Sequence, residues 1–156
     1  MENLEQKAAF LKSDFTKLLS ELPADAPRKW GKMGVQQMIE HMSDYVRIAN
    51  GRTPMDVVTE ADRVPRVQNF LMSEKPFPEN TPNILMPDEP AAVKNTSKEA
   101  AIAELQNELD HFFEVHHLEQ GKNLNNPFFG ELTFDMQVQL LHKHGTHHLR
   151  QFSAID

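Results

Sequence analysis

Four of the eight histidines of this 156-residue chain lie in the segment "LLHKHGTHHLRQFSAI", residues 140–155. His144 and His148 are the only histidines spaced four residues apart, which places them on one face of an α-helix. His41 lies within the apolar stripe of an earlier predicted helix. Neutral imidazole binds zinc, nickel, copper and iron, and three protein ligands leave a coordination position open for chemistry. The pattern therefore predicts a divalent-metal site formed by His41, His144 and His148.

Two polar residues follow these histidines at helical spacing. Gln151, close to the predicted face of the pair, is expected to orient a ligand imidazole or a bound water. Tyr45, one turn after His41, is a candidate hydrogen-bond donor in the pocket, with a core tyrosine as the alternative. A histidine on an apolar face is also a common core residue, and an isolated HxxxH pair is weak evidence for metal. The third inward histidine, on a separate helix, strengthens the metal interpretation.

The remaining histidines are assigned roles outside the site. His111, His116 and His117 are predicted to complement the dipole at the C-terminal half of the third long helix. His142 and His147 are expected to point outward or into a subunit contact. Glu40 and Asp44 flank His41 but fall off its apolar face, so both are expected to be solvated, and no general base is named.

The histidines require helices to hold them, and helical periodicity dominates the sequence. The first predicted helix ends before Pro23, and its stripe comprises Leu4, Ala8, Leu11, Phe15, Leu18 and Leu22. The second is capped by Gly34 with Gln37 and ends at "NG", residues 50–51. The third opens with a capping box of Thr96 and Glu99. Its buried stripe comprises Ile102, Leu105, Leu109, Phe112 and Phe113. The fourth starts near Thr133.

The connection between the second and third helices, residues 52 to about 95, is rich in proline. Seven of the ten prolines of the chain fall there, with a short helix expected at "RVQNFLM". Four long helices with one long crossover predict an all-α fold, a four-helix bundle in which helices two and three run parallel. A single domain over residues 1–156 is expected.

Composition excludes several classes of protein. Acidic residues outnumber basic ones 23 to 16, a formal net charge of -7, so a nucleic-acid partner is not expected even at "HHLR". No apolar run approaches the roughly 20 residues of a membrane helix. The chain has no cysteine, and its first residues do not resemble a signal peptide, so a cytoplasmic location is predicted.

Four segments, "WGKMGVQQMIEHM", "KPFPENTP", "NPFFGELT" and "HKHGTHHLRQF", resemble the DinB/YfiT-like superfamily of metal-binding four-helix bundles. They are similar in particular to a branch of it whose reaction is not known, and the resemblance spans nearly the whole chain. It implies an up-down-down-up bundle with a triad that falls on His41, His144 and His148. The segment before the last helix more often reads "HPFFG" in this branch, and Asn126 replaces that histidine here.

Characterised members of the superfamily include metal-dependent thiol S-transferases and a thiol-dependent isomerase, and many are homodimers. The resemblance thus implies a homodimeric metal-dependent enzyme, a thiol-dependent S-transferase or hydrolase acting on a small molecule. Zinc is the expected ion, with nickel, iron or manganese as alternatives. A thiol nucleophile would come from a low-molecular-weight cosubstrate. Trp30, Phe128 and Phe129 are expected to cover the pocket or cap the end of the bundle. The competing hypothesis is a non-catalytic bundle that acts through dimerisation or partner binding.

Overall fold

The computed structural model describes residues 2–81, 86 and 89–156 of the chain, and it is mostly helical with one small two-stranded sheet. In chain order the helical elements are α1 (Leu4–Ala9), the π-helical turn η1 (Phe10–Asp14), α2 (Phe15–Glu21), α3 (Val35–Ala49), the 3-10 turn η2 (Ala61–Arg63), α4 (Val64–Met72), α5 (Lys98–Leu118) and α6 (Phe134–Gln151). The antiparallel strands β1 (Leu124–Asn126) and β2 (Gly130–Leu132) precede α6. Within the described ranges, no helix has the length and apolar character needed to cross a membrane.

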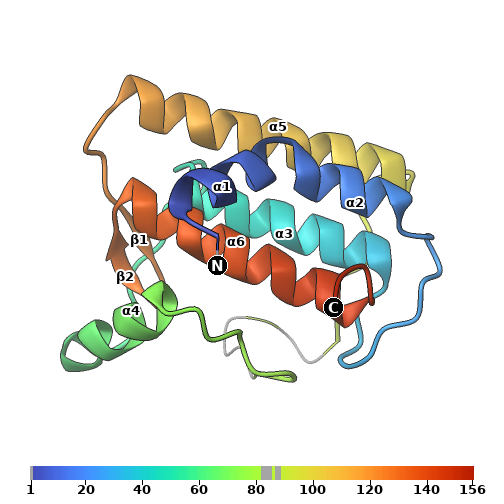
Figure 1. Cartoon of the computed structure of the whole chain (residues 1–156), viewed down its shortest axis with the longest axis horizontal. Coiled ribbons are helices and arrows are strands. Elements are labelled where there is room, and N and C mark those ends of the chain that lie inside the picture. Colours follow the sequence, from blue (N-terminus) through green and yellow to red (C-terminus); the bar gives the residue numbers. More distant parts are fainter. Residues whose placement is uncertain (1, 82–85, 87–88) are drawn as a thin grey trace.

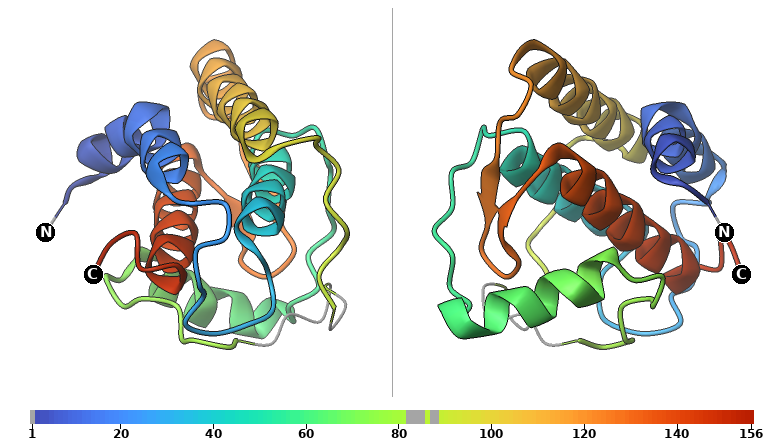
Figure 2. Two further views of the ribbon diagram at one scale, coloured as in Figure 1. Left: turned by 90° about the vertical axis from the view of Figure 1, so that its right-hand side faces the viewer. Right: turned by 60° about the vertical axis from the view of Figure 1, so that its left-hand side comes forward.

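Four helical segments enclose the main core, as the left view of Figure 2 shows. They are α3, α5, α6 and the rod formed by α1, η1 and α2, while α4 lies outside this group and packs on α6 (Figure 1). Phe15, Met42, Leu109 and Leu141, one from each segment, are buried in one continuous cluster. Each such side chain contributes about 1.5–3 kcal/mol when it is fully buried.

The first helix departs from the predicted stripe at its C-terminal half. Leu11 and Phe15 are buried as expected, but Leu19 takes the core position predicted for Leu18, which is only half-buried. The cause is the π-helical turn η1, which holds more residues per turn than an α-helix. Steps of four residues from Leu11 through Phe15 to Leu19 consequently remain on the core face.

Helix termini largely follow the sequence signals. At the start of α3 the Gly34 amide donates to Gln37 Oε1 at 2.8 Å, and Gly51, with φ of +87°, follows the C-cap of α3. Helix α5 differs by one residue, because Ser97 and not Thr96 is its N-cap and accepts a hydrogen bond from the Ala100 amide. The sequence offers two adjacent hydroxyl side chains there, and propensity does not separate them.

The core face of α5 also differs from the predicted stripe. Leu105, Leu109 and Phe112 are buried as expected. Ile102 and Phe113 are only half-buried, while Ala101 is fully buried. The ammonium of Lys12 lies over the Phe113 ring, so this edge of the helix is covered by a polar side chain.

The crossover between α3 and α5 contains the predicted short helix, α4. The two-stranded hairpin β1–β2 was not predicted. Its tip is shaped by Asn126, whose Oδ1 accepts the amides of Phe128 at 2.9 Å and Phe129 at 3.1 Å. Gln68 of α4 donates to the Phe129 carbonyl at 2.8 Å, which joins the crossover to the hairpin. Pro82, the last residue of the "KPFPENTP" segment, and Pro87 lie outside the described residues.

A polar cluster anchors the C-terminal end of α4 to α6. The ammonium of Lys143, a buried residue of α6, donates to the carbonyls of Phe70 at 3.0 Å, Ser73 at 2.8 Å and Lys75 at 2.5 Å. Gln139, one turn earlier, donates to Ser73 O and accepts from Lys7 of α1. These bonds satisfy the open carbonyls at the end of α4 and fix the backbone that leads to Phe77.

Candidate metal centre

Three imidazole rings from two helices converge beside α6. His41 Nε2 of α3 lies 3.1 Å from His144 Nε2 of α6, and His148 Nε2 lies 3.0 Å from the same His144 atom. The ligand atoms of the three rings all lie within 4.8 Å of one another, so this group could hold a metal ion. The sequence prediction of this grouping from helical spacing agrees with the structure.

The three Nε2 atoms cannot all be satisfied by hydrogen bonds among themselves. A neutral imidazole carries one N–H, and His144 Nε2 can donate to only one of its two neighbours. Ligand nitrogens bound at about 2.0–2.1 Å to a tetrahedral zinc lie about 3.3–3.4 Å apart. The observed separations of 3.1 and 3.0 Å are a few tenths of an ångström shorter. Three neighbouring imidazoles whose ligand atoms all lie within 4.8 Å of one another are a donor set that could hold a divalent cation.

Gln151 determines which nitrogen of His148 is free. Its Nε2 donates to the Trp30 carbonyl at 2.9 Å, which turns its Oε1 toward His148 Nδ1 at 2.8 Å. Because Oε1 can only accept, His148 Nδ1 carries the proton and Nε2 keeps its lone pair. Gln151 thus orients the His148 ring and fixes its tautomer, which is what groups outside the ligand set do in metal sites.

Gly31 makes room for this amide. It adopts a φ of +76°, and a Cβ at this position would come within 2.9 Å of Gln151 Nε2. Residue 31 of the loop between α2 and α3 therefore favours glycine, because of its positive φ and because a side chain there would displace the Gln151 amide.

Burial keeps the three rings neutral. Desolvation, with a further contribution from His147, lowers the pKa of His41 from 6.5 to about 4. Desolvation, followed by the repulsion of His148 and His41, holds the pKa of His144 well below its ordinary value. The pKa of His148 is also well below its usual range, because burial and His41 outweigh the opposing hydrogen bond to Gln151. Neutral rings are the form that binds metal.

Tyr45 contacts the site through its ring. Its centroid is 4.8 Å from that of His41 and 4.8 Å from that of His144, nearly perpendicular to the latter. It therefore packs against the rings of both His41 and His144, and it also lines the adjoining pocket.

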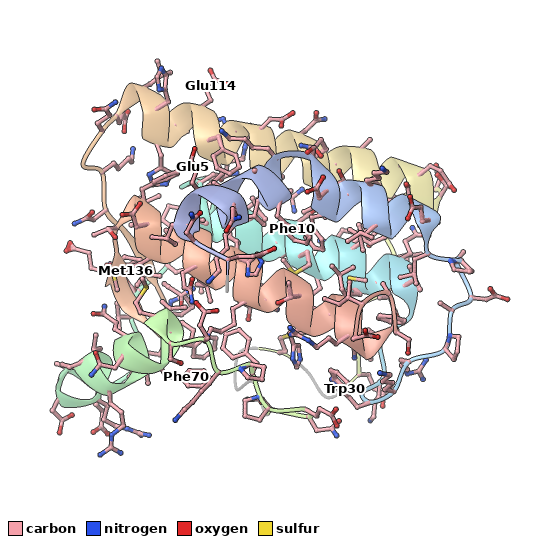
Figure 3. The ribbon with its side chains drawn as sticks, in the orientation of Figure 1. Glu5, Phe10, Trp30, Phe70, Glu114 and Met136 are labelled. Carbon is pink, nitrogen blue, oxygen red and sulfur yellow. The ribbon has the colours of Figure 1, made fainter. Side chains whose placement is uncertain are left out.

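A pocket of about 950 Å³ opens beside the triad, within the size range of small-molecule sites. The three clustered histidines line it together with an aromatic wall of Trp30, Phe77, Phe128 and Phe129. Figure 3 shows Trp30 in the loop before α3 and Phe70, which packs on Phe77, on α4; both lie on the lower side of α6. Trp30 and the paired phenylalanines thus line the pocket, as the sequence had suggested.

Two other histidines of α6 do not behave as predicted. His147 lines the pocket instead of pointing outward: its ring is 5.2 Å from Trp30 and hydrogen-bonds to the Phe77 backbone. His142 lies against Phe10, with its Nε2 2.9 Å from a Glu2 carboxylate oxygen. Both positions depend on how α4 and the N-terminal residues pack against α6, which helical periodicity does not reveal.

Two further expectations are corrected by burial. His116 does not act mainly at the helix dipole, because it is buried between Phe112 and Phe134 and contacts the Ala49 carbonyl at 3.2 Å. Glu40 is buried and not solvated.

The Glu40 carboxylate accepts the backbone amides of Lys94 at 2.8 Å and Asn95 at 2.9 Å, and so holds the end of the crossover. Burial alone would raise the pKa of Glu40, but these hydrogen bonds hold it below its ordinary value. Asp44, by contrast, is exposed and pairs with Arg47, as expected for a surface acid.

Comparison with known proteins adds no relative: no family model, no curated protein and no solved structure matches this chain. The functional argument consequently depends on the site itself.

Proposed function

We propose that this protein is a metal-dependent enzyme that acts on a small molecule through a divalent cation held by His41, His144 and His148. The observation that carries the proposal is the convergence of three neutral Nε2 atoms, one of them fixed by Gln151, at the wall of a small-molecule pocket. Structural histidines usually have their ring nitrogens satisfied by carbonyls or hydroxyls, and these three face one another.

Zinc is the ion that this donor set favours most, because three imidazoles with an open position resemble catalytic zinc sites. Nickel, iron and manganese are the alternatives. A bound divalent ion would supply Lewis acidity and positive charge at the wall of the pocket. Gln151 would hold the ring of His148 in the ligating tautomer, and Tyr45 would keep the rings of His41 and His144 in place.

The aromatic wall would exclude water from the reacting groups and position an apolar substrate. Among the residues that the structure describes, no aspartate or glutamate lines the pocket, so a carboxylate general base is not part of the proposal. The chain has no cysteine, so a reaction of the thiol S-transferase type would need a low-molecular-weight thiol as cosubstrate.

We assign the chain to the DinB/YfiT-like superfamily and to its up-down-down-up four-helix bundle on two grounds. The triad joins the second long helix to an HxxxH pair on the last, as in that superfamily. Helices α3 and α5 pack extensively against each other, and the long connection between them allows them to run parallel.

Elemental analysis of protein purified without a metal-affinity tag tests the proposal. About one equivalent of zinc or another transition metal per chain is expected, and the double variant His41→Ala, His144→Ala should lose it while remaining folded. Protein that contains no metal and binds neither zinc nor nickel in equilibrium dialysis would instead support a non-catalytic helical protein. With the metal established, thiol cosubstrates paired with a panel of electrophiles would identify the reaction.

A further inference from the structure

The charges that line the pocket differ in sign from those of the chain as a whole. The protein carries a formal net charge of -7, yet the charged side chains among the described lining residues, histidines aside, are the cations Lys32 and Arg63. Burial lowers the pKa of His147 and the nearby Glu79 carboxylate opposes this lowering, but Glu79 does not line the pocket. An anion entering this space meets positive groups on a negative protein.

Arg63 is the cation available to a ligand. The ammonium of Lys32 is already 2.8 Å from a carboxylate oxygen of Glu89. Across the described ranges, the Arg63 guanidinium has no hydrogen-bond or ion-pair partner, although four of the other five arginines, Arg28, Arg47, Arg52 and Arg150, have one. A guanidinium presents paired donors that match a carboxylate, phosphate or sulfonate.

Arg63 lines the same pocket as the aromatic wall, so one ligand could contact both. It is the N-cap of α4, and Val67, one turn further along that helix, also lines the pocket. The partial positive charge at the start of a helix further favours an anion there. Phe77, Phe128 and Phe129 offer the apolar surface that the body of such a ligand would cover.

The proposed metal site also favours an anionic ligand. Three neutral imidazoles leave both charges of a divalent cation uncompensated, and within the described part of the chain no carboxylate at the pocket offsets them. We infer that this pocket binds an amphipathic organic acid; that the pocket is the substrate site rests on the proposed function. The apolar body of this acid lies against the aromatic wall, and its anionic group pairs with Arg63.

A pair of fluorescent probes isolates the role of charge. 8-Anilinonaphthalene-1-sulfonate and N-phenyl-1-naphthylamine share an aromatic body, and only the first carries an anion. In chelator-treated full-length protein, Arg63→Gln should weaken binding of the sulfonate about fivefold, the loss typical of one exposed ion pair. Binding of the neutral amine should stay within about twofold. Arg66→Gln is the matched control, because Arg66 lies on the same helix, is exposed and does not line the pocket.

Equal losses for both probes, no loss for the sulfonate, or the same loss in Arg66→Gln would each overturn the inference. Among the described residues the Arg63 guanidinium has no partner to lose, so the variant and the wild type should have the same melting temperature. A lower melting temperature would show that the variant is misfolded. Zinc binding by the wild type and by Arg63→Gln is measured separately. Absence of zinc binding in both would sink the proposed function, whereas intact zinc binding without an Arg63 effect would sink this inference alone.

Discussion

Two faces of α6 carry polar side chains that are buried or partly buried. The two faces differ in how many of these polar atoms have hydrogen-bond partners. On one face the ammonium of Lys143 has three carbonyl partners, and both ends of the Gln139 amide are paired. On the other, the Nε2 atom of His144 lies next to those of His148 and His41, and His148 Nδ1 is the ring nitrogen that has a further partner among the described residues. Polar groups whose hydrogen bonds are all made stabilise the fold, whereas neighbouring imidazole nitrogens without such partners are suited to bind a cation.

The largest expected effect comes from removing a shared ligand. His144→Ala should weaken zinc binding by at least about 100-fold, because it removes one of three ligands and the central atom of the cluster. His142→Ala, two residues away and paired with Glu2, should leave zinc affinity within about twofold. Isothermal titration with zinc measures both, and equal losses in the two variants would contradict the assignment.

Acid should destabilise the metal-free protein through the same cluster. The pKa of His41 is about 4 in the folded chain and 6.5 is its ordinary value, so the unfolded chain binds more protons between these pH values. The His41 contribution is therefore fully present above about pH 6.5 and is lost as pH falls toward 4. It should reduce the free energy of unfolding by about 2 kcal/mol between pH 7.5 and pH 5.

Urea unfolding of chelator-treated protein across this pH range measures the effect. His41→Gln, which keeps a polar side chain that does not titrate, should show a shallower decline. An unchanged slope in that variant would refute the attribution to His41.

On the face that carries Lys143, substitution should cost stability and spare the metal. Lys143→Met removes one hydrogen-bond donor from each of the carbonyls of Phe70, Ser73 and Lys75 and should lower the free energy of unfolding by about 2 kcal/mol. Zinc affinity should change by less than about twofold. Lys17→Met, at an exposed position of α2, is the control for loss of a lysine charge. Loss of zinc binding in Lys143→Met would show that the two faces are not independent.

Two glutamines extend the contrast. Gln151→Leu removes the partner of His148 Nδ1 and should weaken zinc binding about tenfold. Gln139→Leu removes an amide from the other face and should lower stability without weakening zinc binding. Titration and urea unfolding of both variants should give opposite patterns, and similar patterns would contradict the distinction.

The smallest effect concerns the glycine that supports Gln151. Gly31→Ala and Gly121→Ala both place alanine at a positive φ, +76° and +82°, and each should cost about 1 kcal/mol of stability. A Cβ at Gly31 meets Gln151 Nε2 at 2.9 Å, while one at Gly121 meets nothing within 4 Å. Only Gly31→Ala should therefore also weaken zinc binding, by a few-fold, and equal zinc affinities would argue against the Gly31 contact.

Helical spacing predicted the grouping of the three histidines and the place of Gln151, because both depend on periodicity within one helix and on apolar stripes that must face a core. It did not predict Leu19 in the core, since nothing in "FLKSD" distinguishes a π turn from an α turn. The hairpin was not predicted either, because each strand has only three residues, too few to show an alternation of apolar and polar side chains.

The roles of Glu40, Lys143 and His147 could not be predicted for a different reason. Each depends on a partner in the crossover, at Asn95, Phe70 or Phe77, far along the chain. Periodicity locates the face on which a side chain lies, but it does not reveal which loop will cover that face. A signal was available for Lys143 alone, as a lysine next to a strongly apolar stripe.

The separation of His41 and His144 by 103 residues gives the cluster a mechanical consequence. An ion bound by both would act as a removable cross-link that closes a very long loop of the polypeptide. Separation of α3 from α6 during unfolding would break the bonds to that ion, so a loaded protein should survive denaturing conditions longer than the metal-free protein. A chelator that removed the ion would also remove this cross-link, so the resistance of the protein to unfolding would depend on the metal supply.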